Sequence, residues 1–218
     1  MIRGAIFDFD GTLFDSMFIW KTAGDIYLRS LGKEPEADLQ KTLKTMSLRQ
    51  SAAYMQRAYG LSASVEEIMD GVNRTVEAFY FNTVEPKVDV IPFLNRMKEE
   101  GIKMCIVTAT DRYQVEATLR RCGMDTFFSD IFTCSDVGHG KDEPMIFRKA
   151  LKHLQTTRAD TIVFEDAFHA LQTASDDGFM TVAVYDSSEE REEELRNLAD
   201  FFLESYHNTD SFWKFASA

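Results

Sequence analysis

Short runs of apolar residues recur along the chain and are separated by segments with helical periodicity. Each run is rich in β-branched or aromatic residues and apolar on both faces, which is typical of parallel strands covered by helices. The runs lie at residues 6–9, 102–108, 131–134, 161–164 and 180–184. Between them, Ile91, Leu94 and Met97 share one helical face, and Pro144 suits the first turn of a helix that continues to about Leu154. This alternation predicts an α/β fold with a doubly wound parallel sheet.

Residues 17–82 break the alternation. Two stripes of apolar residues at helical spacing run through this segment. They consist of Leu48, Ala52, Met55 and Tyr59, and of Val65, Ile68, Val72, Val76 and Phe79. The pattern predicts an all-helical domain at residues 16–83, inserted into an α/β core domain formed by residues 1–15 and 84–218. Segments 14–16 and 84–87 are the expected hinges.

Composition narrows the class of protein. The 218 residues include 24 basic and 36 acidic side chains, a net charge of −12. Such a chain is a poor partner for DNA, RNA or an anionic membrane surface, and no apolar run approaches the roughly 20 residues of a spanning helix. Charges near the N-terminus argue against a signal peptide, and Cys105, Cys122 and Cys134 lack paired or zinc-like spacing. We therefore expect a cytoplasmic protein whose partners include neither nucleic acid nor membrane.

The pair Asp8 and Asp10 stands at the carboxyl end of the first predicted strand. Residues i and i+2 of an extended chain point the same way, and ligands of open α/β sheets bind at that edge. Two unit charges about 4 Å apart repel by roughly 4 kcal/mol at an effective dielectric constant near 20. The pair is therefore expected to meet a cation, share a proton or take part in a reaction, with a solvated turn as the alternative.

Three further segments carry groups that suit the same edge of the sheet. Glu165 and Asp166 follow the strand predicted at residues 161–164 and would complete a set of four acids, although an acidic helix N-terminus alone would explain them. A site of oxygen ligands, without thiol or imidazole, suits Mg²⁺ rather than zinc. Thr108 ends another strand and offers a hydroxyl and backbone N–H groups to an anion. Lys141 lies in a glycine-rich turn, where a solvated lysine is the simpler interpretation of that residue alone.

These segments occur in order, and the chain resembles the haloacid dehalogenase superfamily, in the phosphatase and β-phosphoglucomutase-like subgroup with a helical cap after the first strand. Four motifs carry the resemblance: DFDGTLFDS at residues 8–16, VTAT at 107–110, GKDEP at 140–144 and VFEDA at 163–167. The resemblance covers roughly the whole chain. It implies a Rossmann-like core and identifies the helical insertion as the cap.

The resemblance also implies a role for each acid of the site. Asp8 would be the nucleophile that forms an aspartyl-phosphate. Asp10 would protonate the leaving oxygen and then activate the water that hydrolyses the intermediate. Mg²⁺ would be held by the Asp8 carboxylate, the Asp10 backbone carbonyl and Asp166, with Glu165 assisting directly or through water. The implied enzyme is a Mg²⁺-dependent phosphatase.

Binding of the substrate is implied for the second and third motifs. Thr108, with Ala109 beside it, would bind phosphoryl oxygens, and Lys141 would neutralise their charge. The fourth motif departs from the common pattern at Ala167, where serine is frequent, but every carboxylate is kept. We expect the substrate to be a small phosphorylated metabolite, either a sugar phosphate or a phospho-acid, and the protein to be a monomer or weak homodimer.

Other activities of the same superfamily remain to be weighed. Dehalogenation is disfavoured because dehalogenases lack the acid found here as Asp10. A β-phosphoglucomutase-like phosphomutase is the closer alternative: the segment at residues 46–49 resembles the cap loop in which those mutases place a substrate-binding arginine, here Arg49. Against it, Trp20 stands near the place of a mutase cap histidine, and a later cap lysine is missing. A catalytically idle binding protein on this fold is the third reading, disfavoured because no motif carboxylate is lost.

Overall fold

The chain divides into two units that are joined by two connecting segments. The computed structural model describes residues 2–43, 46 and 48–217. One unit, here the core unit, comprises Met1–Asp15 and Val84–Ala218, and the other, here the helical unit, comprises Ser16–Thr83. The two connections run side by side where they leave the core unit, because the Asp15 N–H donates to the Glu85 carbonyl at 3.1 Å.

The core unit is built on one parallel sheet with the strand order β3-β2-β1-β4-β5-β6. The strands are β1 Gly4–Phe7, β2 Lys103–Thr108, β3 Ile131–Thr133, β4 Thr161–Glu165, β5 Met180–Val184 and β6 Phe201–Leu203. The predicted α/β class and parallel sheet are therefore confirmed. The sixth strand was not predicted, because three apolar residues after an acidic segment are too short a signal.

The first strand ends earlier than its apolar pattern indicates. Pairing in β1 stops at Phe7, although the Asp8 N–H still donates to the Phe164 carbonyl at 2.9 Å. The chain then turns at Gly11, whose φ of 73° is a conformation that glycine adopts without steric cost. Asp8 and Asp10 therefore lie in the loop that leaves the strand, with Phe9 fully buried between them.

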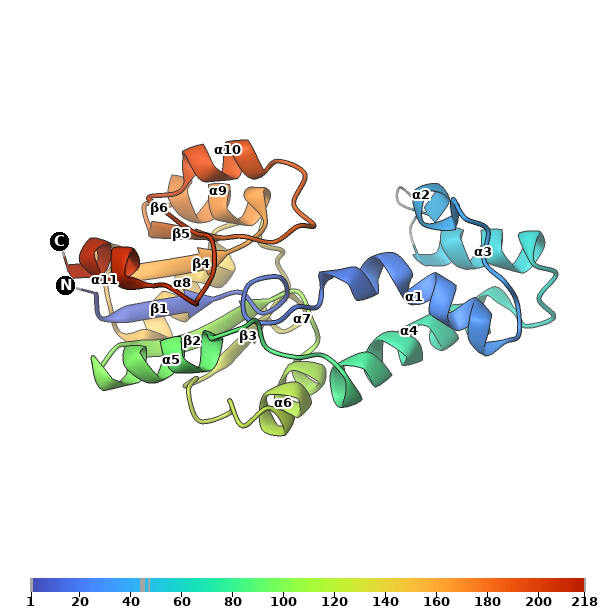
Figure 1. Ribbon diagram of the computed structural model, residues 1–218, viewed down its shortest axis with the longest axis horizontal. Coiled ribbons are helices and arrows are strands. Elements are labelled where there is room, and N and C mark those ends of the chain that lie inside the picture. The colour runs from blue at the N-terminus through green and yellow to red at the C-terminus, as the bar shows by residue number, and fades with distance from the viewer. Residues whose placement is uncertain (1, 44–45, 47, 218) are drawn as a thin grey trace. The chain divides into compact units, whose positions relative to one another are not determined.

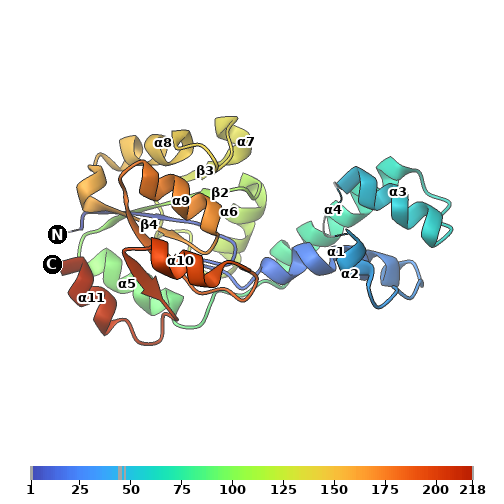
Figure 2. The ribbon, with the colours of Figure 1, turned by 90° about the horizontal axis from the view of Figure 1, so that it is seen from above.

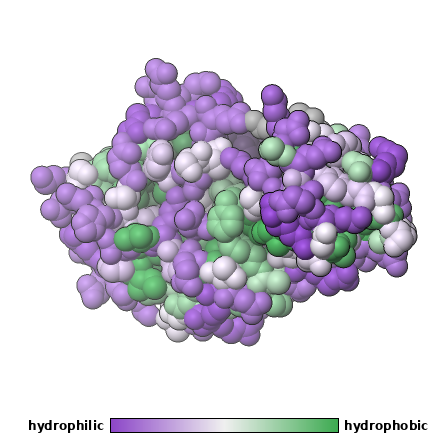
Figure 3. Space-filling model, turned by 45° about the vertical axis from the view of Figure 1, so that its right-hand side comes forward, coloured by the Kyte–Doolittle hydropathy of each residue, from purple (hydrophilic) through white to green (hydrophobic). Residues whose placement is uncertain are grey.

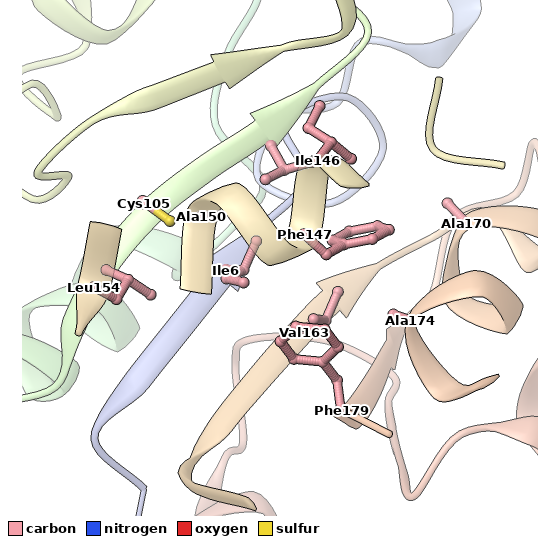
Figure 4. Packing of buried hydrophobic residues seen from close by; sticks show 11 residues of the cluster. Ile6, Cys105, Ile146, Phe147, Ala150, Leu154, Val163, Ala170, Ala174 and Phe179 are labelled. Atoms are coloured by element: carbon pink, nitrogen blue, oxygen red, sulfur yellow. The ribbon is translucent and has the colours of Figure 1, made fainter. Parts of the chain in front are cut away.

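Helices cover both faces of the sheet (Figures 1 and 2). Those of the core unit are α5 Val90–Glu99, α6 Arg112–Arg121, α7 Cys134–Val137, α8 Met145–Leu154, α9 Phe168–Asp176, α10 Glu192–Leu198 and α11 Asp210–Ser217, with a 3₁₀ turn at Arg158–Asp160. Side chains alternate across the strands, so that neighbouring residues face opposite helices. Figure 4 shows Ile6 and Val163 packed against Phe147 of α8.

The opposite face carries an aromatic cluster. Phe7 of β1 stacks on Phe164 of β4 with ring centroids 4.3 Å apart. Phe93 of α5 and Phe212 of α11 approach Phe164 at 5.9 Å and 5.6 Å. The C-terminal helix therefore completes the core instead of only lining the edge of the sheet.

The helical unit contains α1 Met17–Ser30, α2 Leu39–Leu43, α3 Leu48–Ala58 and α4 Val65–Asn82. A capping box starts α4: the Ser64 hydroxyl accepts from the Glu67 N–H, and the Glu67 carboxylate accepts from the Ser64 N–H. Helices α1 and α4 approach closely at Gly71, where an added Cβ would lie 2.2 Å from the Tyr27 ring. Glycine is required there by the packing.

On the face drawn in Figure 3, hydrophilic residues predominate and hydrophobic residues reach the surface only in patches. Within the described part of the chain, every helix is too short or too polar to span a bilayer.

Candidate active site

The carboxyl ends of three adjacent strands bring the predicted polar residues together. Strand β1 lies between β2 and β4, so the residues that end these strands are neighbours in space. Asp8 follows β1, Thr108 ends β2 and Glu165 ends β4, with Asp166 next in the chain. The polar groups that these three strands present at their carboxyl ends therefore share one edge of the sheet.

Three carboxylates form the centre of this site. Oxygen atoms of Asp8, Glu165 and Asp166 lie within 4.8 Å of one another, and the residues are only 6%, 1% and 3% exposed. The Lys141 ammonium donates to Glu165 Oε1 at 2.8 Å and also to Asp8 Oδ1. The lysine side chain is 9% exposed. Lys141 is therefore a buried partner of the acids, and the solvated interpretation of this residue is wrong.

The acids outnumber the cation that faces them, and their protonation reflects this. Burial and the neighbouring Glu165 charge raise the pKa of Asp8 to about 7, although Lys141 acts in the opposite direction. The same two causes raise the pKa of Asp166 well above its usual range. Burial alone would lower the pKa of Lys141, but Asp8 and Glu165 more than reverse this and raise it. The site therefore has a deficit of positive charge.

The second aspartate of the first motif is held differently. The Thr110 hydroxyl donates to Asp10 Oδ2 at 2.6 Å. The Thr110 N–H donates to the Thr108 hydroxyl oxygen at 3.0 Å, which leaves the Thr108 O–H proton available to an anion. Asp10 is half-buried, whereas Thr108 and Thr110 are buried. Thr110 thus contacts both Asp10 and the hydroxyl of Thr108, which is predicted to bind the phosphoryl group.

Two more residues support the acids without having been predicted. The Thr12 hydroxyl donates to Asp166 Oδ1 at 3.2 Å. The buried Tyr206 hydroxyl donates to the Thr12 carbonyl at 3.1 Å. Thr110 has a local signal in the sequence, because it stands two residues after Thr108 in the second motif. Tyr206 has no such signal, since 194 residues separate it from Thr12.

The remaining predicted residues lie at the margin of the site or in the other unit. Ala109 is exposed next to Thr108. Arg49 belongs to α3 of the helical unit, where it donates to Glu66 Oε1 at 2.8 Å with both side chains largely exposed. Of the loop compared with the mutases, Ser47 lies outside the described residues. Arg49 as a substrate-binding residue therefore stays a prediction.

Comparison with known proteins matches this chain to a protein family. The family model of haloacid dehalogenase-like hydrolases matches residues 5–184. A phosphorylated carbohydrates phosphatase of Thermotoga maritima is 24% identical over 177 residues, which cover 81% of this chain and 82% of that protein. The pyrophosphatase PpaX of Bacillus mycoides is 30% identical over 123 residues, 56% of this chain and 57% of that protein.

A solved structure extends the comparison to the whole fold. The crystal structure of a candidate β-phosphoglucomutase from Thermotoga maritima matches with a TM-score of 0.86, covering 98% of this chain and 99% of that chain at 21% sequence identity. At this identity the similarity shows a common fold, and it does not decide between the activities found on that fold.

Proposed function

The chain belongs to the haloacid dehalogenase-like hydrolases, and from this premise we propose that it is a Mg²⁺-dependent phosphatase of a small phosphorylated metabolite, a sugar phosphate or a phospho-acid. Family membership confirms the resemblance drawn from the four motifs and an enzyme activity in the phosphatase and phosphomutase-like group. The observation that carries the finer proposal is the cluster of Asp8, Glu165 and Asp166 around Lys141. It combines a carboxylate nucleophile with a place for a divalent cation.

The donor set fits Mg²⁺. All three clustered side chains offer carboxylate oxygens, the ligands that this ion prefers. Their raised pKa values reflect a shortage of positive charge that a divalent ion would relieve. Asp8, Asp166 and the Asp10 backbone carbonyl would hold the ion, with Glu165 assisting directly or through water. When bound, Mg²⁺ reduces the repulsion between a carboxylate nucleophile and an anionic phosphoryl group.

The proposed reaction has two steps, and the residues of the chain serve both. In the first, an Asp8 oxygen attacks phosphorus, the bond to the leaving oxygen breaks, and Asp10 gives that oxygen a proton. In the second, water attacks the aspartyl-phosphate, Asp10 takes its proton, and Asp8 leaves as a carboxylate. Thr108 and Lys141 bind the phosphoryl oxygens through both steps, since stabilising their charge is the main demand of phosphoryl transfer.

The charges around the site favour phosphatase over phosphomutase. A mutase must hold a doubly phosphorylated intermediate and therefore needs cationic groups for both ends. Within the described part of the chain, Lys141 is the cation whose charge lowers the pKa of both Asp8 and Asp166. The candidate for a second, Arg49, pairs with Glu66. A substrate with a single phosphate suits this distribution better.

The helical unit is proposed to act as the cap that selects the substrate. Its helices α1 and α4 line a groove of about 760 Å³, in which Phe18, Tyr27 and Phe79 provide apolar surface and Arg74 a positive charge. A surface of this kind suits an organic group with some apolar area and a negative charge. Variation at Phe18 and Arg74 is expected to change the substrate and leave the chemistry unchanged.

Replacing the nucleophile tests the proposed function. Asp8→Asn should reduce Mg²⁺-dependent hydrolysis of p-nitrophenyl phosphate on the order of a thousandfold or more, because an amide cannot form the aspartyl-phosphate. Asp15→Asn is the matched control, since it changes an exposed aspartate of the same motif. Activity that survives in Asp8→Asn would overturn the assignment. With hexose phosphates, isomerisation without phosphate release would favour the mutase instead.

Metal binding has a test that does not depend on activity. At saturating Mg²⁺ the melting temperature should rise by several degrees, because a ligand that binds only the folded state stabilises it by about 2.7 kcal/mol at one hundred times its Kd. Asp166→Asn should abolish the rise. An equal rise of the melting temperature in that variant would mean that Mg²⁺ binds elsewhere in the protein.

A further inference from the structure

Thr110 makes two hydrogen bonds that join different parts of the site. Its hydroxyl donates to Asp10 Oδ2 at 2.6 Å, and its backbone N–H donates to the Thr108 hydroxyl oxygen at 3.0 Å. The residue is 4% exposed. A short bond from a buried hydroxyl to a carboxylate belongs to the stronger class of hydrogen bonds and fixes the direction of both groups.

The position of Thr110 in the chain makes this contact stiff. It follows β2 by two residues, and the next residue, Asp111, begins α6 as its N-cap. The Gln114 and Val115 N–H groups donate to the Asp111 carbonyl at 3.0 Å and 3.2 Å, which secures the first turn of the helix. The Thr110 hydroxyl is therefore held by a strand end on one side and a helix start on the other.

We propose that Thr110 is a positioning residue for Asp10, an inference that rests on the proposed function. Because Oδ2 accepts the hydrogen bond from Thr110, the proton that Asp10 delivers is carried on Oδ1. Asp8 forms its bond to phosphorus, the ester bond breaks with its electron pair passing to the leaving oxygen, and the Oδ1 proton moves to that oxygen. Asp10 becomes a carboxylate, whose Oδ1 then takes a proton from the attacking water.

A positioning role differs from a purely structural one in its dependence on the leaving group. Loss of the Thr110 hydroxyl should slow a substrate whose leaving group needs a proton more than one whose leaving group does not. Phenyl phosphate and p-nitrophenyl phosphate differ only by the para nitro group, but phenolate is about as basic as a tyrosine side chain, whereas p-nitrophenolate leaves without help. Thr110→Val keeps the shape of the side chain and removes the hydroxyl. We expect kcat/KM for phenyl phosphate to fall roughly tenfold to thirtyfold, because general acid catalysis contributes a factor of about 100 to 10,000 and depends on placement.

The same variant should lose less than about threefold in kcat/KM for p-nitrophenyl phosphate. Thr110→Ser should restore the wild-type ratio of the kcat/KM values for the two substrates. Asp10→Asn should shift this ratio further than Thr110→Val does. If Thr110→Val lost kcat/KM equally on both substrates, so that their ratio stayed at the wild-type value, the inference would be overturned. Should Thr110→Val fold poorly, Thr110→Ser, which keeps the hydroxyl, must still show the wild-type ratio, and a lower relative activity on phenyl phosphate in that variant would overturn the inference equally. A wild-type protein that hydrolyses neither ester would instead refute the proposed function, so the two failures are distinguishable.

Discussion

The core unit buries charged groups and the helical unit exposes aromatic ones. In the core unit, Asp8, Glu165 and Asp166 are almost completely buried and tied to Lys141. In the helical unit, Phe18 and Trp20 are 49% and 53% exposed, although both lie beside other aromatic rings. Burying like charges raises the free energy of the folded state, and exposing large apolar side chains forgoes hydrophobic stabilisation.

Each unit departs in a different way from the arrangement that stability alone would favour. Such departures mark functional surfaces, because a sequence optimised only for folding would avoid them. The buried acids agree with the chemistry proposed for the core unit, and the exposed rings and the groove agree with the recognition proposed for the helical unit. Substitutions of the buried acids and of the exposed rings should therefore have different effects on stability.

The largest loss of stability is expected in the aromatic cluster of the core unit. Phe164 is fully buried and contacts Phe7, Phe93 and Phe212. Phe164→Ala should reduce the free energy of unfolding by about 3–5 kcal/mol, because it leaves a cavity. Urea denaturation in a Trp20→Phe background would follow Trp213 of the same unit alone, since the chain has two tryptophans. A loss below about 1 kcal/mol would show that the cluster is loosely packed.

The buried acids should make stability depend on pH in an unusual direction. Asp8 has a pKa of about 7 in the folded protein against 3.8 ordinarily, so the folded state holds its proton longer than the unfolded state. Without metal, stability should therefore fall as the pH rises from about 4 to about 7, by a few kcal/mol at most. Asp8→Asn should flatten this slope in chemical denaturation series. A slope unchanged by the substitution would mean that burial and the neighbouring charges do not raise the pKa of Asp8.

A smaller effect is expected where the helices of the helical unit touch. Gly71→Ala would place a Cβ 2.2 Å from the Tyr27 ring. Overpacking costs about 1–3 kcal/mol and is partly offset by the better helix propensity of alanine, about 1 kcal/mol. Thermal unfolding should show a net loss, and the double variant Gly71→Ala with Tyr27→Leu should recover part of it. Additive losses would exclude the contact as the cause.

The smallest effect is expected at an exposed ring. Phe18 meets Phe79 edge to face, with centroids 5.0 Å apart. Phe18→Ala should cost less than about 1 kcal/mol, because the ring is already half in water. Phe79→Ala, its matched control at 8% exposure, should cost about 3 kcal/mol or more. Equal costs would mean that Phe18 helps to hold the fold, and would weaken its assignment to recognition.

Much of the fold and of the site could be predicted from local patterns. Apolar runs identified five of the six strands, and the acids at their ends identified the edge at which Asp8 and Glu165 meet. The pattern failed where the signal was short, as at Phe201–Leu203. It also failed where chain direction depends on a turn: β1 ends at Phe7 because the loop at Gly11 redirects the chain.

The sequence by itself determined which residues can do chemistry, because strand periodicity and motif spacing are local properties of the chain. It determined the α/β class, the helical insertion and the set of acids that suits a divalent cation. Which of these groups are in contact depends on the tertiary fold. Lys141 lies between Asp8 and Glu165, Thr110 holds Asp10, and Tyr206 supports the loop that carries Thr12. Such contacts join residues 24 to 194 positions apart, and they depend on the order of strands in the sheet, which no local pattern records.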